Sequence, residues 1–425
     1  MSEENKSSAA PQKKQKSIYG PVPSVPTQEA ADGIRFDFND GLRVSFPDNG
    51  KTYRVAFADP DTGTILYSAD TKPGSTVTSV KKYFVRFRLT IHEKNREKPV
   101  FEHDYNAEGR EVMIQLPVGT IGDSIGWFSY VERFQKKHKC KLICVMTPWI
   151  ADILRKQYPD ITFIPPEDTL KYKPYASYYL GLFFGGNVDN QPIDFRYIGL
   201  HRTAGYILGV DPSDIPPRFN LTAPRQIKEK YVCIAAQSSS QAKYWNNPFG
   251  WREVIRFLRE NGYRVLCIDK EPVHGIGLHW NFMPWGVEDF TGDRPLQERV
   301  DLIKDADFFI GLSSGLSWLA WGCKVPVVMI SGFTHPTNEF ATPYRIINYH
   351  TCHSCWNDMR ENFDHYDFLW CPRHKGDDRQ FECTRLISAE QVINTIKKIP
   401  TFRPSEKPVA LPDVNKPKDT IKRDN

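Results

Sequence analysis

The sequence predicts an α/β protein made of two facing Rossmann-like domains, with a small β domain before them and a four-cysteine insertion near the end. Three observations predict this class. Short apolar–polar alternations fill the first quarter of the chain, two later blocks repeat strand–turn–helix units, and four cysteines fall within one stretch. Alternation with a period of two indicates strands, and strand–helix repeats indicate a parallel sheet.

Composition and charge favour a small-molecule ligand over nucleic acid. The chain has 425 residues, of which 40% are hydrophobic and 13% aromatic, enough to build cores in roughly three domains. Its 56 basic and 51 acidic residues give a formal net charge of +5. This small excess suits an anionic small molecule but falls short of a nucleic-acid footprint.

Both ends of the chain are predicted to be tails, the first disordered and the second flexible. Residues 1–30 and 401–425 are polar and rich in Lys and Pro. The start lacks the apolar region of a secretion signal. No stretch approaches the roughly 18 uninterrupted apolar residues of a membrane span. We therefore expect a cytoplasmic protein without a membrane span.

Residues 31–110 are predicted to form the small β domain, as a barrel or a sandwich. Three turn signals separate its alternating runs: Asn-Asp-Gly at 39–41, Asp-Asn-Gly at 48–50 and Asp-Thr-Gly at 61–63. Runs bounded by such turns are typical of antiparallel strands. No residue of this domain carries recognisable chemistry.

Two blocks, 111–225 and 226–400, are predicted to be Rossmann-like because compact apolar runs alternate in them with segments of helical spacing. In the first block we expect strands at 111–118, 141–147 and 161–165 and helices at 127–138 and 149–159. In the second we expect strands at 231–237, 263–269, 307–314 and 326–331 and helices at 250–262, 295–306 and 315–323. Two such domains facing across a cleft form the arrangement called GT-B in glycosyltransferases.

A glycine-rich turn at 119–127 should place Gly122 and Asp123 at the carboxyl edge of the first sheet. Ligands of α/β domains bind at that edge. A carboxylate there could act as general base for an incoming hydroxyl group. The alternative interpretation is that Asp123 only caps the following helix.

The second Rossmann-like block carries two further motifs. In the loop 235–251, the ammonium group of Lys243 could meet a diphosphate, with Trp245 two residues later. The alternative is a solvated lysine beside a core tryptophan. Ser313, Ser314 and Gly315 end a strand and open a helix, whose free N–H groups favour anions. Ordinary N-capping by serine is the alternative there.

The four clustered cysteines, spaced Cys352-x2-Cys355-x15-Cys371-x11-Cys383, predict a metal site in residues 350–385. Four thiolates can close a tetrahedral site, although only the first pair has the close spacing common for zinc. A redox pair would need a thioredoxin-like unit, and disulfides are rare in the cytoplasm. Unrelated thiols remain the alternative, and spacing does not choose between zinc and iron.

In order and spacing, the motifs resemble the ADP-heptose heptosyltransferases, which extend the lipopolysaccharide core. The matching letters are Gly122-Asp123, Lys243-Tyr244-Trp245, Thr291-Gly292, Ala306-Asp307, Gly311, Ser314-Gly315 and Leu319-Ala320. The chain departs from that pattern at Ser313, where Asp is usual, and at Trp318, where His is usual.

With the β domain before this core and the cysteines after it, nearly the whole chain resembles the bacterial autotransporter heptosyltransferases. The resemblance implies a cytoplasmic protein O-heptosyltransferase that moves heptose from ADP-glycero-manno-heptose to serine hydroxyls of an autotransporter adhesin. It also implies a homo-oligomer, a dodecamer, and one iron ion per subunit, with zinc as the alternative. The implied metal ligands are Cys352, Cys355, Cys371 and Cys383.

The resemblance further implies a single displacement with inversion at the sugar. Asp123 would act as base and Lys243 would stabilise the departing ADP. The expected substrate contacts are Gly122, Trp245, Thr291, Gly292, Ser313, Ser314, Gly315 and Trp318. Weaker candidates for the sugar pocket are Thr334, His335 and Asn338.

Two rival interpretations stay open at this point. In the first, the acceptor of the heptose is a lipopolysaccharide or another glycan rather than a protein. In the second, the protein is not an enzyme, and its cleft senses a nucleotide while the metal knuckle contacts a partner. A nucleic-acid partner is disfavoured because the residues around the cysteines mix both signs of charge.

Overall fold

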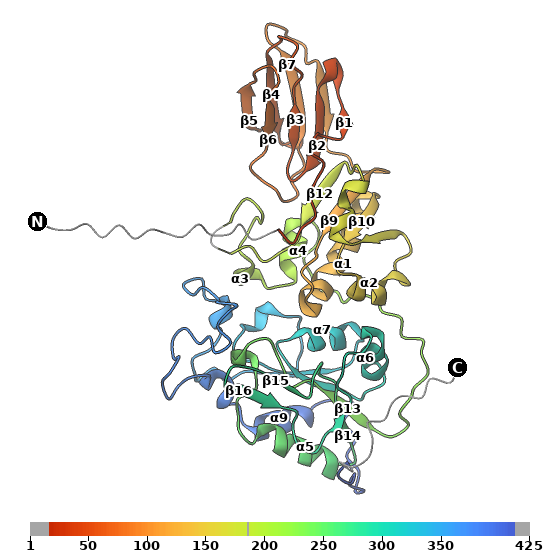
Figure 1. Cartoon of the computed structure of the whole chain (residues 1–425), viewed down its shortest axis with the longest axis vertical. Coiled ribbons are helices and arrows are strands. Elements are labelled where there is room, and N and C mark those ends of the chain that lie inside the picture. The colour runs from red at the N-terminus through yellow and green to blue at the C-terminus, as the bar shows by residue number, and fades with distance from the viewer. Residues whose placement is uncertain (1–16, 185–186, 413–425) are drawn as a thin grey trace, which may run out of the picture.

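The computed structural model describes residues 17–184 and 187–412. Figure 1 shows a β-rich region at one end, an α/β domain in the middle and a second α/β domain at the other end. The outer parts of the expected tails, 1–16 and 413–425, lie outside the described residues. Among the described helices, none is long and apolar enough to cross a membrane.

The first Rossmann-like sheet is longer than the sequence predicts, because strands of the expected small β domain extend it. Its order is β11 (Ile161–Ile164), β10 (Lys141–Val145), β9 (Glu111–Gln115), β12 (Ala176–Tyr179), β2 (Arg35–Asn39), β3 (Arg43–Ser45) and β6 (Thr76–Thr78), with β1 (Gln28–Glu29) paired to β2. The run from β11 to β2 is parallel, whereas β1, β3 and β6 pair antiparallel. The boundary expected at residues 110–111 therefore does not separate two sheets.

The remaining N-terminal strands form a separate antiparallel sheet. Its order is β5 (Ile65–Asp70), β4 (Tyr53–Ala58), β7 (Arg88–Glu93) and β8 (Phe101–Asp104). Alternate residues of β4 and β7 are buried, as the apolar–polar alternation predicts. Their buried side chains join the same core cluster as the first Rossmann-like sheet, so the two sheets pack as one body.

The described part of the expected N-terminal tail is packed onto the fold. The Tyr19 hydroxyl donates to the Leu180 carbonyl at 2.9 Å. Gly20 exchanges two hydrogen bonds with the side chain of Gln115 at the end of β9. The expectation of a disordered tail is therefore wrong for residues 17–30, because these residues satisfy polar groups of the first sheet.

The helices of the first domain are α1 (Ile121–His138), α2 (Pro148–Arg155), α3 (Phe195–Ile198) and α4 (Arg202–Ile207). Helix α1 begins six residues earlier than predicted and includes the segment that the sequence suggested as a turn. Gly122 and Gly126 lie inside it because neighbouring side chains approach closely: added Cβ atoms would lie 3.0 and 3.2 Å from Trp318. Two 3-10 turns complete the domain, η1 (Ala31–Gly33) and η2 (Pro166–Lys171).

The second domain has a parallel six-stranded sheet. Its order is β17 (Glu288–Asp289), β14 (Arg264–Cys267), β13 (Tyr231–Ile234), β18 (Phe309–Leu312), β19 (Val327–Ile330) and β20 (Arg345–Ile346). Helices α6 (Leu296–Ile303) and α7 (Gly315–Gly322) cover the face toward the first domain, and α5 (Gly250–Glu260) and α9 (Ala389–Ile396) lie on the opposite face (Figure 1). The two facing α/β domains agree with the predicted GT-B arrangement.

The second domain also contains elements that the sequence did not suggest. These are the hairpin of β15 (Val273–Ile276) and β16 (His279–Phe282), helix α8 (Glu382–Arg385), and the turns η3 (Gln241–Lys243), η4 (Pro336–Asn338) and η5 (Cys355–Asn357). Residues 401–412 run back along α5, where Ser405 and Val409 donate backbone hydrogen bonds to Asn261 and Arg259. The expectation of a flexible tail from residue 401 is therefore wrong for this described part.

Candidate active site

A cavity of about 770 Å³ lies between the two Rossmann-like domains. Eight of the ten predicted reaction and substrate residues line it: Gly122, Asp123, Lys243, Gly292, Ser313, Ser314, Gly315 and Trp318. The first domain contributes residues 119–123, Trp149 and Leu200, and the second domain contributes the rest of the lining. Loops at the carboxyl ends of parallel strands form most of it, which is where α/β domains bind ligands. We call it the interdomain cavity.

Glycines bring the N-termini of α1 and α7 together at this cavity. A Cβ atom added to Gly315 would lie 2.8 Å from Cβ of Ile121 and 3.2 Å from the backbone nitrogen of Gly122. Only a residue without a side chain allows that approach. Two sets of unpaired N–H groups and two positive helix ends therefore meet at one place, which is a favourable environment for an anion.

Asp123 lies in the first turn of α1 and lines the cavity. Its carboxylate accepts a hydrogen bond from the hydroxyl of Thr120, the residue that precedes the helix. Desolvation raises the pKa of Asp123, and the Thr120 hydrogen bond and the positive charges of Lys243 and His365 act in the opposite direction. The result is a carboxylate held at a cavity wall, with a basicity suited to accepting a proton.

Lys243 approaches the cavity from the second domain, at the end of η3. Its ammonium nitrogen lies 5.8 Å from the ring centres of both Phe333 and Trp356, within the range of cation–π attraction. Desolvation lowers the pKa of Lys243, whereas the negative charges of Asp123 and Glu339 raise it. Lys243 thus lies beside two aromatic rings, and two carboxylates act on it electrostatically.

The segment around the start of α7 is fixed by a buried carboxylate that the sequence analysis missed. The Ser313 hydroxyl donates to Oε1 of Glu339, and Asn338 donates to the same oxygen at 3.0 Å. Arg345 pairs with the other oxygen at 2.7 Å. Ser313 is therefore held by Glu339, while Ser314 makes no side-chain capping bond at the helix start.

Asp269 and Arg299 also line the interdomain cavity, and the sequence analysis missed both. Asp269 accepts from the backbone N–H of Ala236 at 2.8 Å, and burial raises its pKa to about 6. The guanidinium of buried Arg299 donates to four backbone carbonyls, those of Ile268, Asp269, Gly292 and Arg294. The position of Asp269 just after a buried strand was an available signal, whereas nothing local marks Arg299.

Two predicted substrate residues do not line the cavity. Trp245 is 4% exposed in the core of the second domain, and its indole N–H donates to the Ile387 carbonyl at 2.9 Å. Thr291 is buried and its hydroxyl bonds to Asp289. Packing turns both side chains away from the cavity, so the structure does not bring them to the other predicted residues. Of the weaker candidates, Thr334 and Asn338 line the cavity and His335 does not.

The four clustered cysteines lie between β20 and α9, and each is partly exposed. Burial, and then the charges of Cys355, Cys371 and Cys352, raise the pKa of the Cys383 thiol, so the four thiols are electrostatic neighbours. Within the described ranges, however, no group of three or more His, Cys, Asp or Glu side chains is arranged to hold a metal ion. The four-thiolate metal site stays a prediction.

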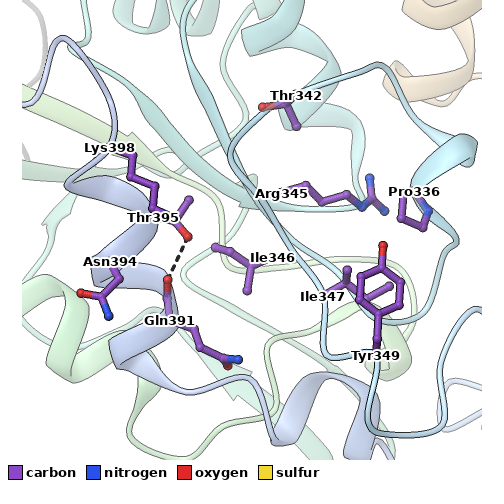
Figure 2. A pocket seen from close by; sticks show the side chains of 10 residues that line it. All are labelled: Pro336, Thr342, Arg345, Ile346, Ile347, Tyr349, Gln391, Asn394, Thr395 and Lys398. Atoms are coloured by element: carbon purple, nitrogen blue, oxygen red, sulfur yellow. Dashed lines mark hydrogen bonds between the residues drawn. The ribbon is translucent and has the colours of Figure 1, made fainter.

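A second hollow, of about 550 Å³, lies between β20 and one face of α9 (Figure 2). It is lined by Pro336, Thr342, Arg345, Ile346, Ile347, Tyr349, Gln391, Asn394, Thr395 and Lys398. None of the predicted site residues belongs to it. Arg345 connects the two cavities: it lines this hollow, and it pairs with Glu339, which lines the interdomain cavity.

Two family descriptions match parts of the chain. Residues 30–95 match the N-terminal domain of glycosyltransferase TibC. Residues 211–359 match glycosyltransferase family 9, described as heptosyltransferase. The first match covers most of the N-terminal strands, and the second covers much of the domain that supplies Lys243 and the α7 helix start.

Three relatives cover most of the chain. Autotransporter heptosyltransferase BAHTCr of Citrobacter rodentium is 55% identical over 377 residues, which are 89% of this chain and 91% of that protein. Autotransporter heptosyltransferase TibC of Escherichia coli is also 55% identical over 377 residues, 89% of this chain and 92% of TibC. Inactive autotransporter heptosyltransferase BimC of Burkholderia thailandensis is 44% identical over 384 residues, 90% of this chain and 89% of BimC.

The fold comparison agrees with the sequence comparison. The crystal structure of TibC, a dodecameric iron-containing heptosyltransferase in complex with ADP-D-β-D-heptose, superposes with a TM-score of 0.86 at 54% identity. The superposition covers 89% of this chain and 98% of TibC. Agreement in sequence and fold over nearly the whole length leads to one conclusion: the chain belongs to the autotransporter heptosyltransferase family.

Proposed function

We propose that this protein transfers heptose from an ADP-heptose donor to serine hydroxyls of an autotransporter adhesin in the cytoplasm. One observation carries the proposal. Asp123 from the first domain and Lys243 from the second face one cavity, at the place where two helix N-termini meet. A base and an anion site on opposite walls are what transfer from a sugar diphosphate to a hydroxyl group requires.

In the proposed reaction, the donor diphosphate binds against Lys243 and the N–H groups at the start of α7. The carboxylate of Asp123 accepts the proton of the acceptor serine. The serine oxygen bonds to the anomeric carbon as the bond from that carbon to the ADP oxygen breaks. ADP leaves with the electron pair, and the single displacement inverts the anomeric centre.

The electrostatics of the cavity support this division of roles. The charge of Lys243 lowers the pKa of Asp123, so a cation placed for the diphosphate also favours the ionised base. The charge of Asp123 in turn raises the pKa of Lys243. The negative charge of Asp123 thus favours the protonated Lys243, and the positive charge of Lys243 favours the ionised Asp123.

We further propose that the subunit binds one iron ion through Cys352, Cys355, Cys371 and Cys383. Four thiolates form a donor set that suits iron as well as zinc. TibC, which is 54% identical, is an iron-containing protein. Metal analysis of the purified protein and of a Cys355→Ser variant tests this. We expect one iron per chain, lost in the variant; zinc at the same ratio contradicts iron, and no metal contradicts the site.

Assembly into a dodecamer is proposed on the same relationship, since the TibC in that crystal structure is dodecameric. Light scattering of the purified protein measures the mass of the particle directly. A mass close to twelve chains is expected. A monomer or a dimer at micromolar concentration would show that the assembly differs in this member of the family.

Co-expression with an autotransporter passenger tests the transfer itself. We expect the intact mass of the passenger to rise in whole heptose increments, and to stay unmodified when the Asp123→Asn variant is co-expressed. Because BimC, at 44% identity, is an inactive relative, family membership alone does not establish turnover. An unmodified passenger, together with transfer to a lipopolysaccharide acceptor supplied in parallel, would assign a different acceptor.

A further inference from the structure

Glu339 presents an electrostatic problem. Its carboxylate is 1% exposed and lines the interdomain cavity, at the N-terminal end of α7 where the donor diphosphate is proposed to bind. An unpaired negative charge at this place would repel a diphosphate. A buried carboxylate also needs strong partners to remain ionised.

The structure supplies those partners. Burial alone would raise the pKa of Glu339, but Arg345 and the hydrogen bonds from Ser313 and Asn338 lower it, so it is ionised at neutral pH. Arg345, whose side chain is 9% exposed, reaches Glu339 from the wall of the hollow between β20 and α9. Figure 2 shows its guanidinium on the Pro336 side of that hollow. The cation that neutralises Glu339 therefore comes from outside the interdomain cavity.

On the cavity side, the charge of Glu339 acts on Lys243. Lys243 lies beside the rings of Phe333 and Trp356, and desolvation there favours the neutral amine. The negative charges that oppose this are Asp123 on α1 and Glu339. His365 is a further titratable neighbour: desolvation and the charge of Lys243 lower its pKa, so it is neutral above pH 7.5.

We propose that Glu339 is a positioning residue for the donor diphosphate: it fixes the start of α7 through Ser313 and supports Lys243, which lines the same cavity, as the cation. The inference rests on the proposed function, because it assigns the diphosphate to Lys243. Asp123 cannot replace Glu339 in this role, since Asp123 takes up a proton in each reaction cycle. Glu339, whose pKa is lowered, keeps its negative charge through the cycle and therefore raises the pKa of Lys243 at every step.

The test is the affinity for ADP measured by calorimetry between pH 7.5 and pH 10, for wild type and Glu339→Gln. Lys243 binds ADP as a cation, so affinity persists below its pKa and falls as the pH rises through it. Removal of the Glu339 charge lowers that pKa, so the variant loses affinity at lower pH. We expect the ratio of wild-type to variant affinity to be smallest at pH 7.5 and to grow as the pH rises.

Two variants separate electrostatics from structure. Glu339→Asp keeps the charge and should restore most of the alkaline affinity, which a purely steric role would not predict. If Glu339→Gln does not fold, the double variant Glu339→Gln/Arg345→Gln removes both buried charges together, which proteins tolerate better than one unpaired charge. It should show the same alkaline loss. A constant ratio of affinities at every pH would overturn the inference.

The Lys243→Met variant distinguishes a failure of the Glu339 proposal from a failure of the proposed function. If Lys243→Met weakens ADP binding but Glu339→Gln leaves the pH dependence unchanged, the role of Glu339 is wrong and the donor site stands. If Lys243→Met binds ADP as tightly as wild type, the diphosphate is not held by Lys243, and the proposed function itself must be revised.

Discussion

The two Rossmann-like domains contribute unequally to the interdomain cavity. The first domain, whose sheet is extended by N-terminal strands, supplies one short segment with Asp123 and two apolar side chains. The second supplies the loops after β13, β14, β18 and β19, with Lys243 and the start of α7. Under the proposed mechanism this difference becomes a division of labour, in which the first domain performs proton transfer and the second binds the donor. Substitutions in the two domains should therefore affect different measured quantities.

The largest expected effect is that of Asp123→Asn. A positioned base is typically worth about 10²–10⁴-fold in rate, and the amide cannot accept the serine proton. Turnover of ADP-heptose with a passenger acceptor should fall by that factor, while the affinity for ADP changes by less than about threefold. Asp152→Asn, on the exposed face of α2, is the matched control. A parallel loss of ADP affinity would contradict the assignment of proton transfer and donor binding to different domains.

Lys243→Met should give the opposite result. A hydrogen bond to a charged group contributes about 1.5–3 kcal/mol, so ADP affinity should fall by about 10- to 100-fold. The thioether keeps much of the side-chain volume beside the two aromatic rings. Calorimetry with ADP measures the effect, and Lys136→Met on the exposed side of α1 is the control. Unchanged ADP affinity with slower turnover would show that Lys243 acts in the chemical step rather than in donor binding.

Trp245→Phe should change stability without changing affinity. The substitution removes the indole N–H bond to Ile387 and leaves a gap in the second core. Denaturant unfolding should show a loss of about 1–3 kcal/mol, with ADP affinity equal to wild type. Trp280→Phe is a control because that side chain is 55% exposed. A marked loss of ADP affinity would show that Trp245 belongs to the substrate site after all.

The smallest effect is expected at Asp214, which links the domains. Its carboxylate accepts from His201 and Arg202 of the first domain and from the backbone N–H of Ala341 in the second. Burial would raise the pKa of Asp214, but these hydrogen bonds hold it well below its usual range. The stabilisation is therefore present above the unfolded pKa, near 4, and is lost as the pH falls.

Asp214→Asn should accordingly lower the unfolding temperature at pH 7 and flatten its fall between about pH 4 and pH 2. Thermal unfolding across that range measures both effects, with Asp211→Asn at an exposed site as the control. If the variant and wild type lose stability in parallel on acidification, the link between the domains does not depend on this carboxylate.

Much of the site followed from where residues stand relative to strand ends. Asp123, Lys243 and Ser314 each follow a buried strand, and parallel strands bring their carboxyl ends to one edge. The sequence did not indicate that β2, β3 and β6 extend the first sheet, because strand alternation shows that strands exist but not which strands pair. It also missed Glu339, whose partner Arg345 becomes relevant only once β20 is placed.

The sequence by itself determined many of the strands and helices of the two Rossmann-like domains, the glycines at the helix starts, and the spacing of the cysteines, because periodicity and turn chemistry are local. Only the tertiary structure decided that Trp318 lines the cavity while Trp245 is buried in the core, and that Glu339 and Lys243 line the same cavity. The physical reason is that the direction of a side chain depends on what packs against it. At this cavity, the packing partners come from segments far apart in the chain.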